Sequence, residues 1–132
     1  LLSRVALTYF RAVDRLFPMG KDLVSTQDMK QAFYFSGENG LKTEPVLRRF
    51  EGDFRGLGRA AERLGGEPLE LADFSVVLYP FPRVAVYYLV WEGDAEEPAR
   101  LSILFDRPIE KVFAPPVIWG LVNLVNAYLI NV

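Results

Sequence analysis

Residues 80–106 read PFPRVAVYYLVWEGDAEEPARLSILFD, and this stretch decides the fold. Two apolar runs, at 83–91 and 101–105, are separated by one short acidic loop. The first run is apolar at both odd and even positions, which is typical of a central strand covered on both faces. Because the loop is short, the two runs are expected to pair antiparallel.

A third run, DFSVVLY at 73–79, precedes this pair. It begins with alternation that puts Phe74, Val76 and Leu78 on one face, as in a strand. Pro80 and Pro82 separate it from the central run, and proline cannot donate to a strand ladder. We therefore expect these prolines to bound strands, and we predict an antiparallel sheet of at least three strands.

Two amphipathic helices are predicted before the sheet. Residues 2–17 repeat apolar side chains at three- and four-residue spacing, with a basic opposite face that we interpret as solvated rather than membrane-bound. A second stripe runs over 43–64, with Thr43 as N-cap and Gly65-Gly66 at its end. Glycines inside it cost about 1 kcal/mol each relative to alanine. The alternative is a break near Gly56.

Residues 21–40 are harder to interpret. The segment from Ser25 to Asp28 has the spacing of a capping box. The run AFYF at 32–35 favours a short strand, because aromatic residues suit a pleated surface. GENG at 37–40 is a turn signal. We expect a short helix or turn, then a strand.

The last element begins at Pro115-Pro116, which suits a helix start. No charged residue follows Lys111. A membrane span would be marginal in length and would contain three asparagines, so a helix covering the sheet is favoured. An uncharged helix needs cover all round, and we therefore expect it to meet a partner chain or a missing segment. The predicted interface is the stripe Trp119, Asn123, Asn126 and Ile130.

Composition excludes several function classes. The 132 residues suit one domain, 1–132, and carry a net charge of −2 with scattered arginines, which gives no footprint for nucleic acid. The sequence has no Cys and no His, which removes thiolate nucleophiles, His-based triads and Cys/His metal sites. No cofactor or metal is expected. No secretory signal pattern is visible, so we expect a cytoplasmic protein.

The acidic loop at 92–98 carries four carboxylates, which raises the question of calcium. Their spacing does not match an EF-hand loop, so an exposed hairpin end is the favoured interpretation.

Four residues are candidates for ligand binding. Arg83 starts the central run and Asp106 ends its antiparallel neighbour, so they should meet at one end of the sheet. There they would form an ion pair, which we favour, or the anion-binding end of a pocket. Trp91 and Asp94 lie at the opposite end, where Trp91 offers a stacking surface. Asp94 and Asp106 are too far apart for a catalytic pair.

Three motifs in this stretch resemble the domain of unknown function 3786 family, an uncharacterised family of anaerobic bacteria and archaea. They are PRV at 82–84, LVWEGDAEEP at 89–98 and ILFD at 103–106. The order of elements upstream, from Val24-Ser25 to the helix before Gly65-Gly66, is also similar. The chain departs from the family at Glu97, where members carry Phe. It also departs at Phe113-Ala114-Pro115, where they carry Leu-Pro, and at Thr26-Gln27, near which they carry Arg.

Members of this family often accompany a four-cysteine iron–sulfur domain. The resemblance therefore implies an association with anaerobic iron–sulfur or corrinoid metabolism. Together, these observations predict a single α+β domain acting as a non-catalytic binding or accessory module. It would bind a small ligand, or a protein partner or second copy through its C-terminal helix. The alternative is an enzyme that acts on an anionic small molecule through carboxylate and Arg chemistry.

Overall fold

A computed structural model describes residues 22–81 and 84–132. The helix predicted for residues 2–17 lies outside these ranges, as do Pro82 and Arg83. The described residues form an α+β fold whose elements are, in chain order, β1 Leu23–Val24, η1 Thr26–Asp28, η2 Ala32–Phe35, η3 Gly37–Asn39, α2 Glu44–Phe50, α3 Arg55–Arg63, β2 Glu67–Leu69, β3 Phe74–Phe81, β4 Val84–Trp91, β5 Arg100–Asp106, α4 Ile109–Val112 and α5 Pro115–Asn131.

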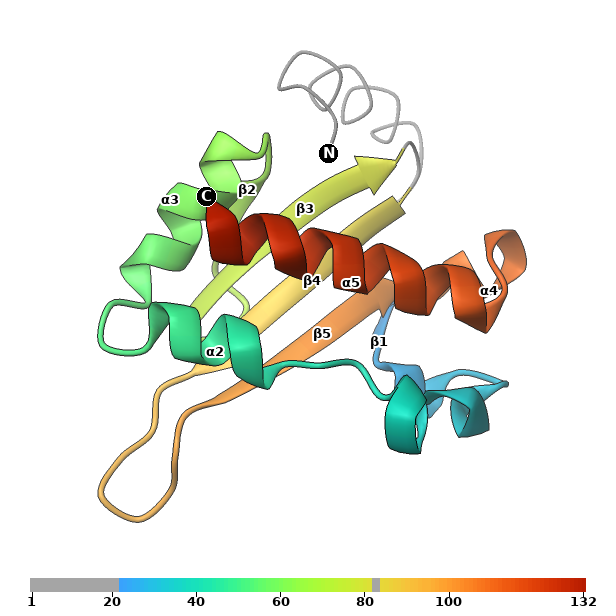
Figure 1. Cartoon of the computed structure of the whole chain (residues 1–132), viewed down its shortest axis with the longest axis horizontal. Coiled ribbons are helices and arrows are strands. Elements are labelled where there is room, and N and C mark those ends of the chain that lie inside the picture. Colours follow the sequence, from blue (N-terminus) through green and yellow to red (C-terminus); the bar gives the residue numbers. More distant parts are fainter. Residues whose placement is uncertain (1–21, 82–83) are drawn as a thin grey trace.

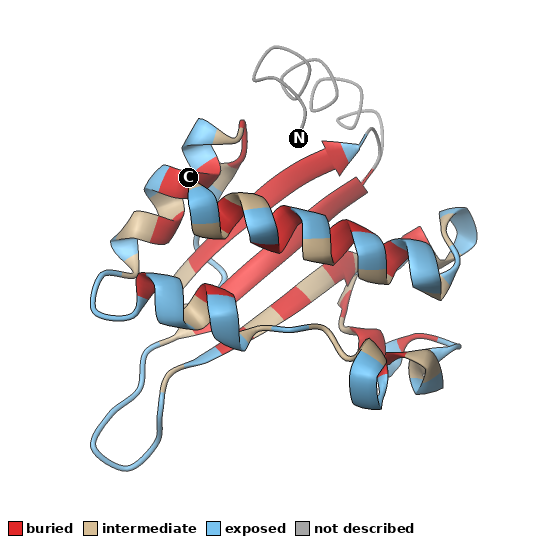
Figure 2. Cartoon of the chain, viewed as in Figure 1, coloured by how far each residue is buried: buried red, intermediate tan, exposed pale blue. Residues whose placement is uncertain are grey.

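The five strands form one sheet in the order β1-β5-β4-β3-β2, and every neighbouring pair is antiparallel (Figure 1). The run that is apolar on both faces is the central strand β4, as predicted. Its register places Val86 opposite Phe105 of β5 and Tyr88 opposite Val76 of β3. Every residue from Val84 to Val90 is buried (Figure 2).

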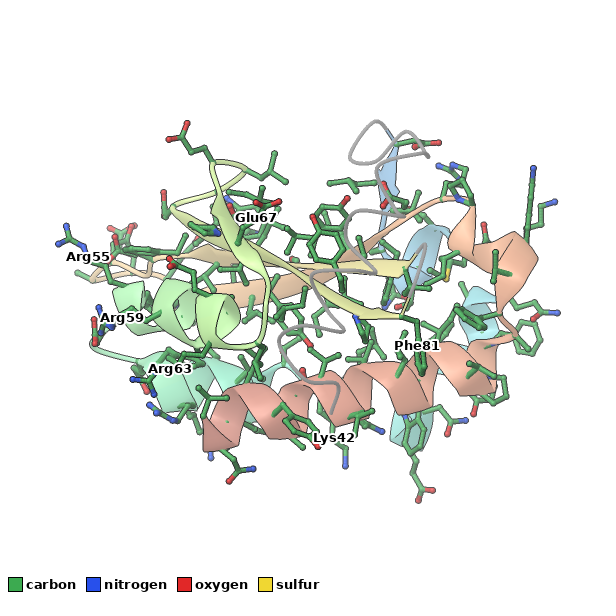
Figure 3. The ribbon with its side chains drawn as sticks, turned by 90° about the horizontal axis from the view of Figure 1, so that it is seen from above. Lys42, Arg55, Arg59, Arg63, Glu67 and Phe81 are labelled. Carbon is green, nitrogen blue, oxygen red and sulfur yellow. The ribbon has the colours of Figure 1, made fainter. Side chains whose placement is uncertain are left out.

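Alternation along the strands divides the core between the two faces of the sheet. Helices α2, α3 and α5 cover one face (Figures 1 and 3). The core on this face combines strand residues Val76, Leu78, Val86, Tyr88, Val90, Ile103 and Phe105 with helix residues Val46, Phe50, Leu57, Ala61, Ile118, Leu121, Val122, Val125 and Leu129. A second buried cluster lies on the other face and consists of Val77, Tyr79, Ala85, Tyr87 and Leu89.

The prediction that prolines bound the strands is wrong for Pro80, which lies inside β3. The pairing of β3 with β4 shifts register between Leu78 and Phe81. Because the ladder is irregular there, a residue without an N–H group is accommodated.

The helix predicted over 43–64 is two helices, and it breaks at Gly52 rather than near Gly56. Gly52 has φ +85°, a conformation that favours glycine and ends the regular helix. Thr43 precedes α2, but its side chain makes no capping hydrogen bond. The predicted end at Gly65-Gly66 is confirmed. Gly65 has φ +86° and the Gly66 N–H donates to the Ala61 carbonyl at 2.8 Å, as in a Schellman motif.

The predicted capping box is present. Ser25 Oγ accepts from Gln27 N–H at 3.2 Å, and the Ser25 N–H donates to Asp28 Oδ2 at 3.2 Å. The strand expected at 32–35 is wrong, since these residues form the 3-10 helix η2. This turn buries Phe35 in the core and leaves Phe33 79% exposed, so tertiary packing overrides the strand preference of the aromatic run.

The C-terminal helix begins at Pro115, as predicted, and packs across the sheet. Within residues 22–81 and 84–132, no helix has the length and apolar character that crossing a membrane requires. Every residue of the 92–98 loop is exposed, in agreement with a hairpin end.

Candidate functional site

A hollow of about 440 Å³ lies at the corner where β5 ends and α4 begins. Its volume falls within the range of small-molecule sites. We call it the α4 hollow, and it is lined by Asp22, Lys30, Asp106, Arg107, Pro108, Glu110 and Lys111. Six of these seven residues are ionisable, while their aliphatic stems and Pro108 supply most of the surface that faces the hollow.

Pairing between β1 and β5 builds this corner. Leu23 lies opposite Asp106, and the Arg107 N–H donates to the Asp22 carbonyl at 2.9 Å. The guanidinium of Arg107 also donates from Nε to Asp22 Oδ2 at 2.6 Å. This hydrogen bond and the charge of Asp22 raise the pKa of Arg107, which therefore stays cationic. The two segments are tied together although they are far apart in sequence.

Asp106 connects the α4 hollow to the second buried cluster through a hydrogen bond. The Tyr87 hydroxyl donates to Asp106 Oδ2 at 3.0 Å, and the Tyr87 ring belongs to the cluster on the face of β4 opposite α5. The carboxylate is thus oriented by a buried aromatic residue. Such a residue holds a charged group in place better than a mobile surface side chain does.

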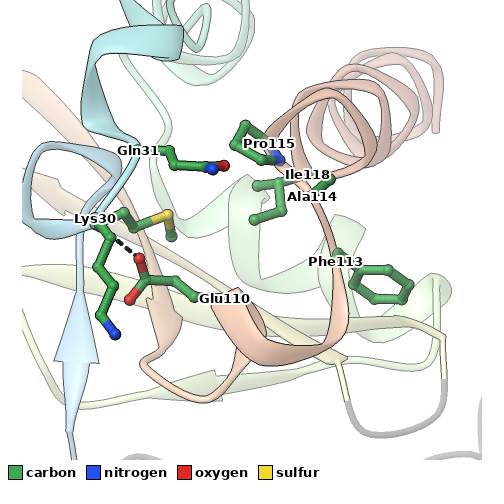
Figure 4. Close-up of a pocket in the computed structure, with 8 residues that line it drawn as sticks. Lys30, Gln31, Glu110, Phe113, Ala114, Pro115 and Ile118 are labelled. Atoms are coloured by element: carbon green, nitrogen blue, oxygen red, sulfur yellow. Dashed lines mark hydrogen bonds between the residues drawn. The ribbon is translucent and has the colours of Figure 1, made fainter.

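Glu110 and Lys30 line both the α4 hollow and a second hollow, whose lining residues Figure 4 shows. Glu110 Oε1 accepts from the Lys30 N–H at 2.6 Å, which ties α4 to the segment before η2. The second hollow has a volume of about 170 Å³ and is lined by Met29, Lys30, Gln31, Glu110, Phe113, Ala114, Pro115 and Ile118. Most of these neighbours are apolar, whereas ionisable side chains ring the α4 hollow.

The end of the sheet where Asp106 lies is the one predicted from antiparallel pairing, because Val86 of β4 faces Phe105 of β5. Arg83, its predicted companion, lies outside the described residues. Sequence reasoning missed Lys30, Arg107, Glu110 and Lys111. The run DRPIEK at 106–111 carried a signal for the last three, since charges directly after a strand cluster at its end. Lys30 had no such signal.

Trp91 and Asp94 lie at the opposite end of β4 and β5, and neither lines the α4 hollow. Arg100 faces Trp91 in the register and places its guanidinium carbon 4.7 Å from the ring centroid. The carboxylate of Asp94 accepts from the N–H groups of Glu97 and Glu96, both at 2.8 Å. These two bonds lower the pKa of Asp94 and close the loop. A ligand role for Trp91 or Asp94 stays a prediction.

The predicted interface stripe on α5 takes part in the fold. Asn126 is buried, its Oδ1 accepts from the Tyr88 hydroxyl at 2.6 Å, and its Nδ2 donates to the Lys42 carbonyl at 2.9 Å. Burial raises the pKa of Tyr88, which keeps that hydroxyl protonated. Trp119 and Ile130 are half-buried against the core, and Trp119 Nε1 finds no acceptor among the described residues. A partner role for the stripe stays a prediction.

Two other features bear on the choice of site. Arginines project from α3 along one side of the molecule (Figure 3) and help line a polar hollow of about 240 Å³. There Arg59 pairs with Asp53 at 2.7 Å, and Arg49 donates to the Ile130 carbonyl at 3.1 Å. The guanidinium groups of Arg59 and Arg49 are thus engaged, whereas Arg63, which also lines this hollow, forms no ion pair within the described residues. No cluster of three or more metal-binding side chains occurs in the described part of the chain.

The fold and this charged corner define an α+β domain with a five-stranded antiparallel sheet and a small hollow beside it. The sequence model of the domain of unknown function DUF3786 matches residues 3–127. The chain therefore belongs to this family. No curated protein and no solved structure gave a significant match.

Proposed function

We propose that this domain is a non-catalytic, cytoplasmic binding module and that the α4 hollow takes a small anionic ligand. The observation that supports this proposal is the balance of charges around the hollow. Among the residues that the structure describes, its ammonium groups are free of ion pairs, whereas its carboxylates are bonded within the protein.

The carboxylates are accounted for one by one. Asp22 pairs with Arg107 at 2.6 Å, and Asp106 and Glu110 accept hydrogen bonds from Tyr87 and from the Lys30 N–H. By contrast, within the described residues neither Lys30 nor Lys111 forms an ion pair through its ammonium group. A carboxylate or phosphate entering the hollow would gain charge-assisted hydrogen bonds from these two lysines without displacing an existing partner.

The proposal is tested by native mass spectrometry of freshly isolated protein, which reports a retained ligand. Backbone amide NMR shifts are then followed during titration with inorganic phosphate, acetate and citrate. We expect shifts at residues 22, 30, 106, 107 and 109–111. The Lys30→Gln, Lys111→Gln double variant should weaken binding by about tenfold or more, since a charge-assisted hydrogen bond contributes about 1.5–3 kcal/mol.

The matched control is the Lys42→Gln, Arg55→Gln double variant, which also removes two positive charges, from exposed residues outside the hollow. It should leave the titration unchanged. Equal losses in both variants would show that only net charge matters, and absence of shifts with every anion would refute the site. Chemical conversion of a retained ligand by the purified protein would favour the enzyme alternative over a module.

We also propose that any link to iron–sulfur or corrinoid chemistry runs through a partner chain. The family association suggests the link, and the absence of Cys and His in these residues supports the route, since no usual cluster ligand is present. Co-purification with an iron–sulfur protein from a native anaerobic host would test it. Recovery of the protein without such a partner would count against it.

A further inference from the structure

The outer face of α5 is unusual for a surface helix. Helix α5 contains no charged residue, and its exposed side presents the row Val117, Gly120, Leu124, Ala127 and Asn131 (Figure 2). We call this row the α5 seam. Val117 is 46% and Leu124 is 42% exposed. The steps between these residues are three, four, three and four, which is the spacing of the a and d positions of a heptad.

A helix that is apolar all round is normally buried all round, whereas a surface helix carries charges on its outer side. Helix α3 of the same chain follows this rule, because Arg55, Arg59 and Arg63 project from it (Figure 3). The inner face of α5 is explained by its contacts with the sheet. Within the described chain no residue covers the seam in this way. Its apolar surface stays in water, and burying it would gain about 25 cal/mol of free energy per Å².

We propose that the α5 seam is the contact between two copies of this chain, which pack their α5 helices antiparallel about a two-fold axis at the level of residue 122. In this arrangement Leu124 of one copy faces Gly120 of the other, and Val117 faces Ala127. Each large side chain thus meets a small one. A Cβ built on Gly120 would meet no atom within 4 Å, so the position is open to receive the opposing leucine.

Self-complementarity favours a second copy over a different protein. An isologous contact uses the same patch twice, so a charge on the two-fold axis would face itself and repel. The seam carries no charge. An unlike partner would normally be selected by complementary charges, and the seam offers none. Antiparallel helices also place each positive dipole end beside a negative one.

The size of the seam sets the strength of the contact. A helix of 17 residues is about 25 Å long at 1.5 Å per residue, and a strip about 10 Å wide gives a footprint of about 250 Å² per copy. Specific stable interfaces bury about 1,200–2,000 Å² in total. Two copies would bury about 500 Å² in total, which is below this range, so the contact that we propose is weak and reversible. The proposal does not depend on a ligand in the α4 hollow, and its failure would leave the proposed function standing.

The test is sedimentation equilibrium of the whole chain from about 10 μM to about 1 mM, where small interfaces associate. We expect wild type to dimerise within this range. Leu124→Glu should weaken dimerisation by at least about tenfold, since it places a charge in the seam. The matched control is Leu71→Glu, because Leu71 is also an exposed leucine, at 49%, and lies outside α5. It should dimerise as wild type does.

The variant Gly120→Leu distinguishes an effect on the dimer contact from an effect on the stability of the fold. Leucine is the better helix former, so this variant should raise the Tm while it removes the space that receives Leu124 and weakens the dimer. The orientation is tested by mixing Val117→Cys protein with Ala127→Cys protein, since the chain has no other cysteine. An antiparallel pair gives the mixed disulfide.

Three results would overturn the proposal: a wild-type monomer throughout the range, a Leu124→Glu dimer as strong as wild type, or disulfides formed only between identical variants. A monomer whose Leu124→Glu variant is destabilised would instead assign the cover to another segment of the same chain.

Discussion

The buried hydrogen bonds between Tyr88 and Asn126 allow a sharp test of what fixes α5 on the sheet. Tyr88 is 0% exposed and donates to Asn126 Oδ1 at 2.6 Å, and Asn126 is 6% exposed. Tyr88→Phe removes the donor and leaves a buried amide oxygen without a partner. Such a loss costs about 1–3 kcal/mol. Asn126→Ala leaves both the Tyr88 hydroxyl and the Lys42 carbonyl unpaired and opens a cavity, so about 2–4 kcal/mol is expected.

The assay is urea unfolding of wild type, the two single variants and the double variant. Because the two groups contact each other directly, we expect a coupling free energy of about 1–2 kcal/mol in the double-mutant cycle. A Tyr88→Phe variant as stable as wild type, or additive losses in the double variant, would refute the reasoning.

The Tyr88 hydroxyl also makes the free energy of unfolding depend on pH in the alkaline range. Burial raises the pKa of Tyr88 above its ordinary value of 10.0. A group whose folded pKa is raised contributes stability that is fully present below its unfolded pKa and is lost as the pH rises above it. Wild type should therefore lose stability from about pH 10 upward more steeply than Tyr88→Phe. Parallel stability curves for the two proteins would contradict this.

Four further predictions concern single residues. Gly65→Ala should destabilise by about 1–2 kcal/mol because Gly65 has φ +86°, whereas Gly58→Ala in the interior of α3, where an added Cβ meets no atom, should stabilise by up to about 1 kcal/mol. Asp94 should titrate below 3.8 by NMR because its pKa is lowered. Its contribution to loop order is thus present above that pH and is lost as the pH falls through the folded pKa. Asp22→Asn should leave the urea midpoint nearly unchanged, since the Asp22–Arg107 pair is half exposed, and a clear shift would show a larger role for this ion pair.

The centre of the fold could be predicted from the sequence because its signals are local. The apolar run that became β4 is continuous, the loops on either side are short, and the helix after Pro115 has a clear start. The margins could not be predicted. β1 has only two residues, and its partner β5 lies on the far side of three other strands in sequence, so no local pattern marks it.

The strand prediction for Ala32–Phe35 was wrong for a related reason. Its strand preference was real, but burial of Phe35 in the helix-covered core decided the outcome. The site follows the same division. Asp106 was predicted from antiparallel pairing alone, whereas Lys30 reaches the hollow only because the chain folds back from β1 toward α4.

The strand order has a consequence for how copies of this protein meet. The two shortest strands, β1 with two residues and β2 with three, lie at the two margins of the sheet. β2 also contains Pro68, which has no N–H group to offer an incoming strand. Short and proline-bearing margins are poor templates for strand addition, the usual start of β-aggregation. The sheet is thus protected against growth from end to end, and contacts between copies are left to the helices.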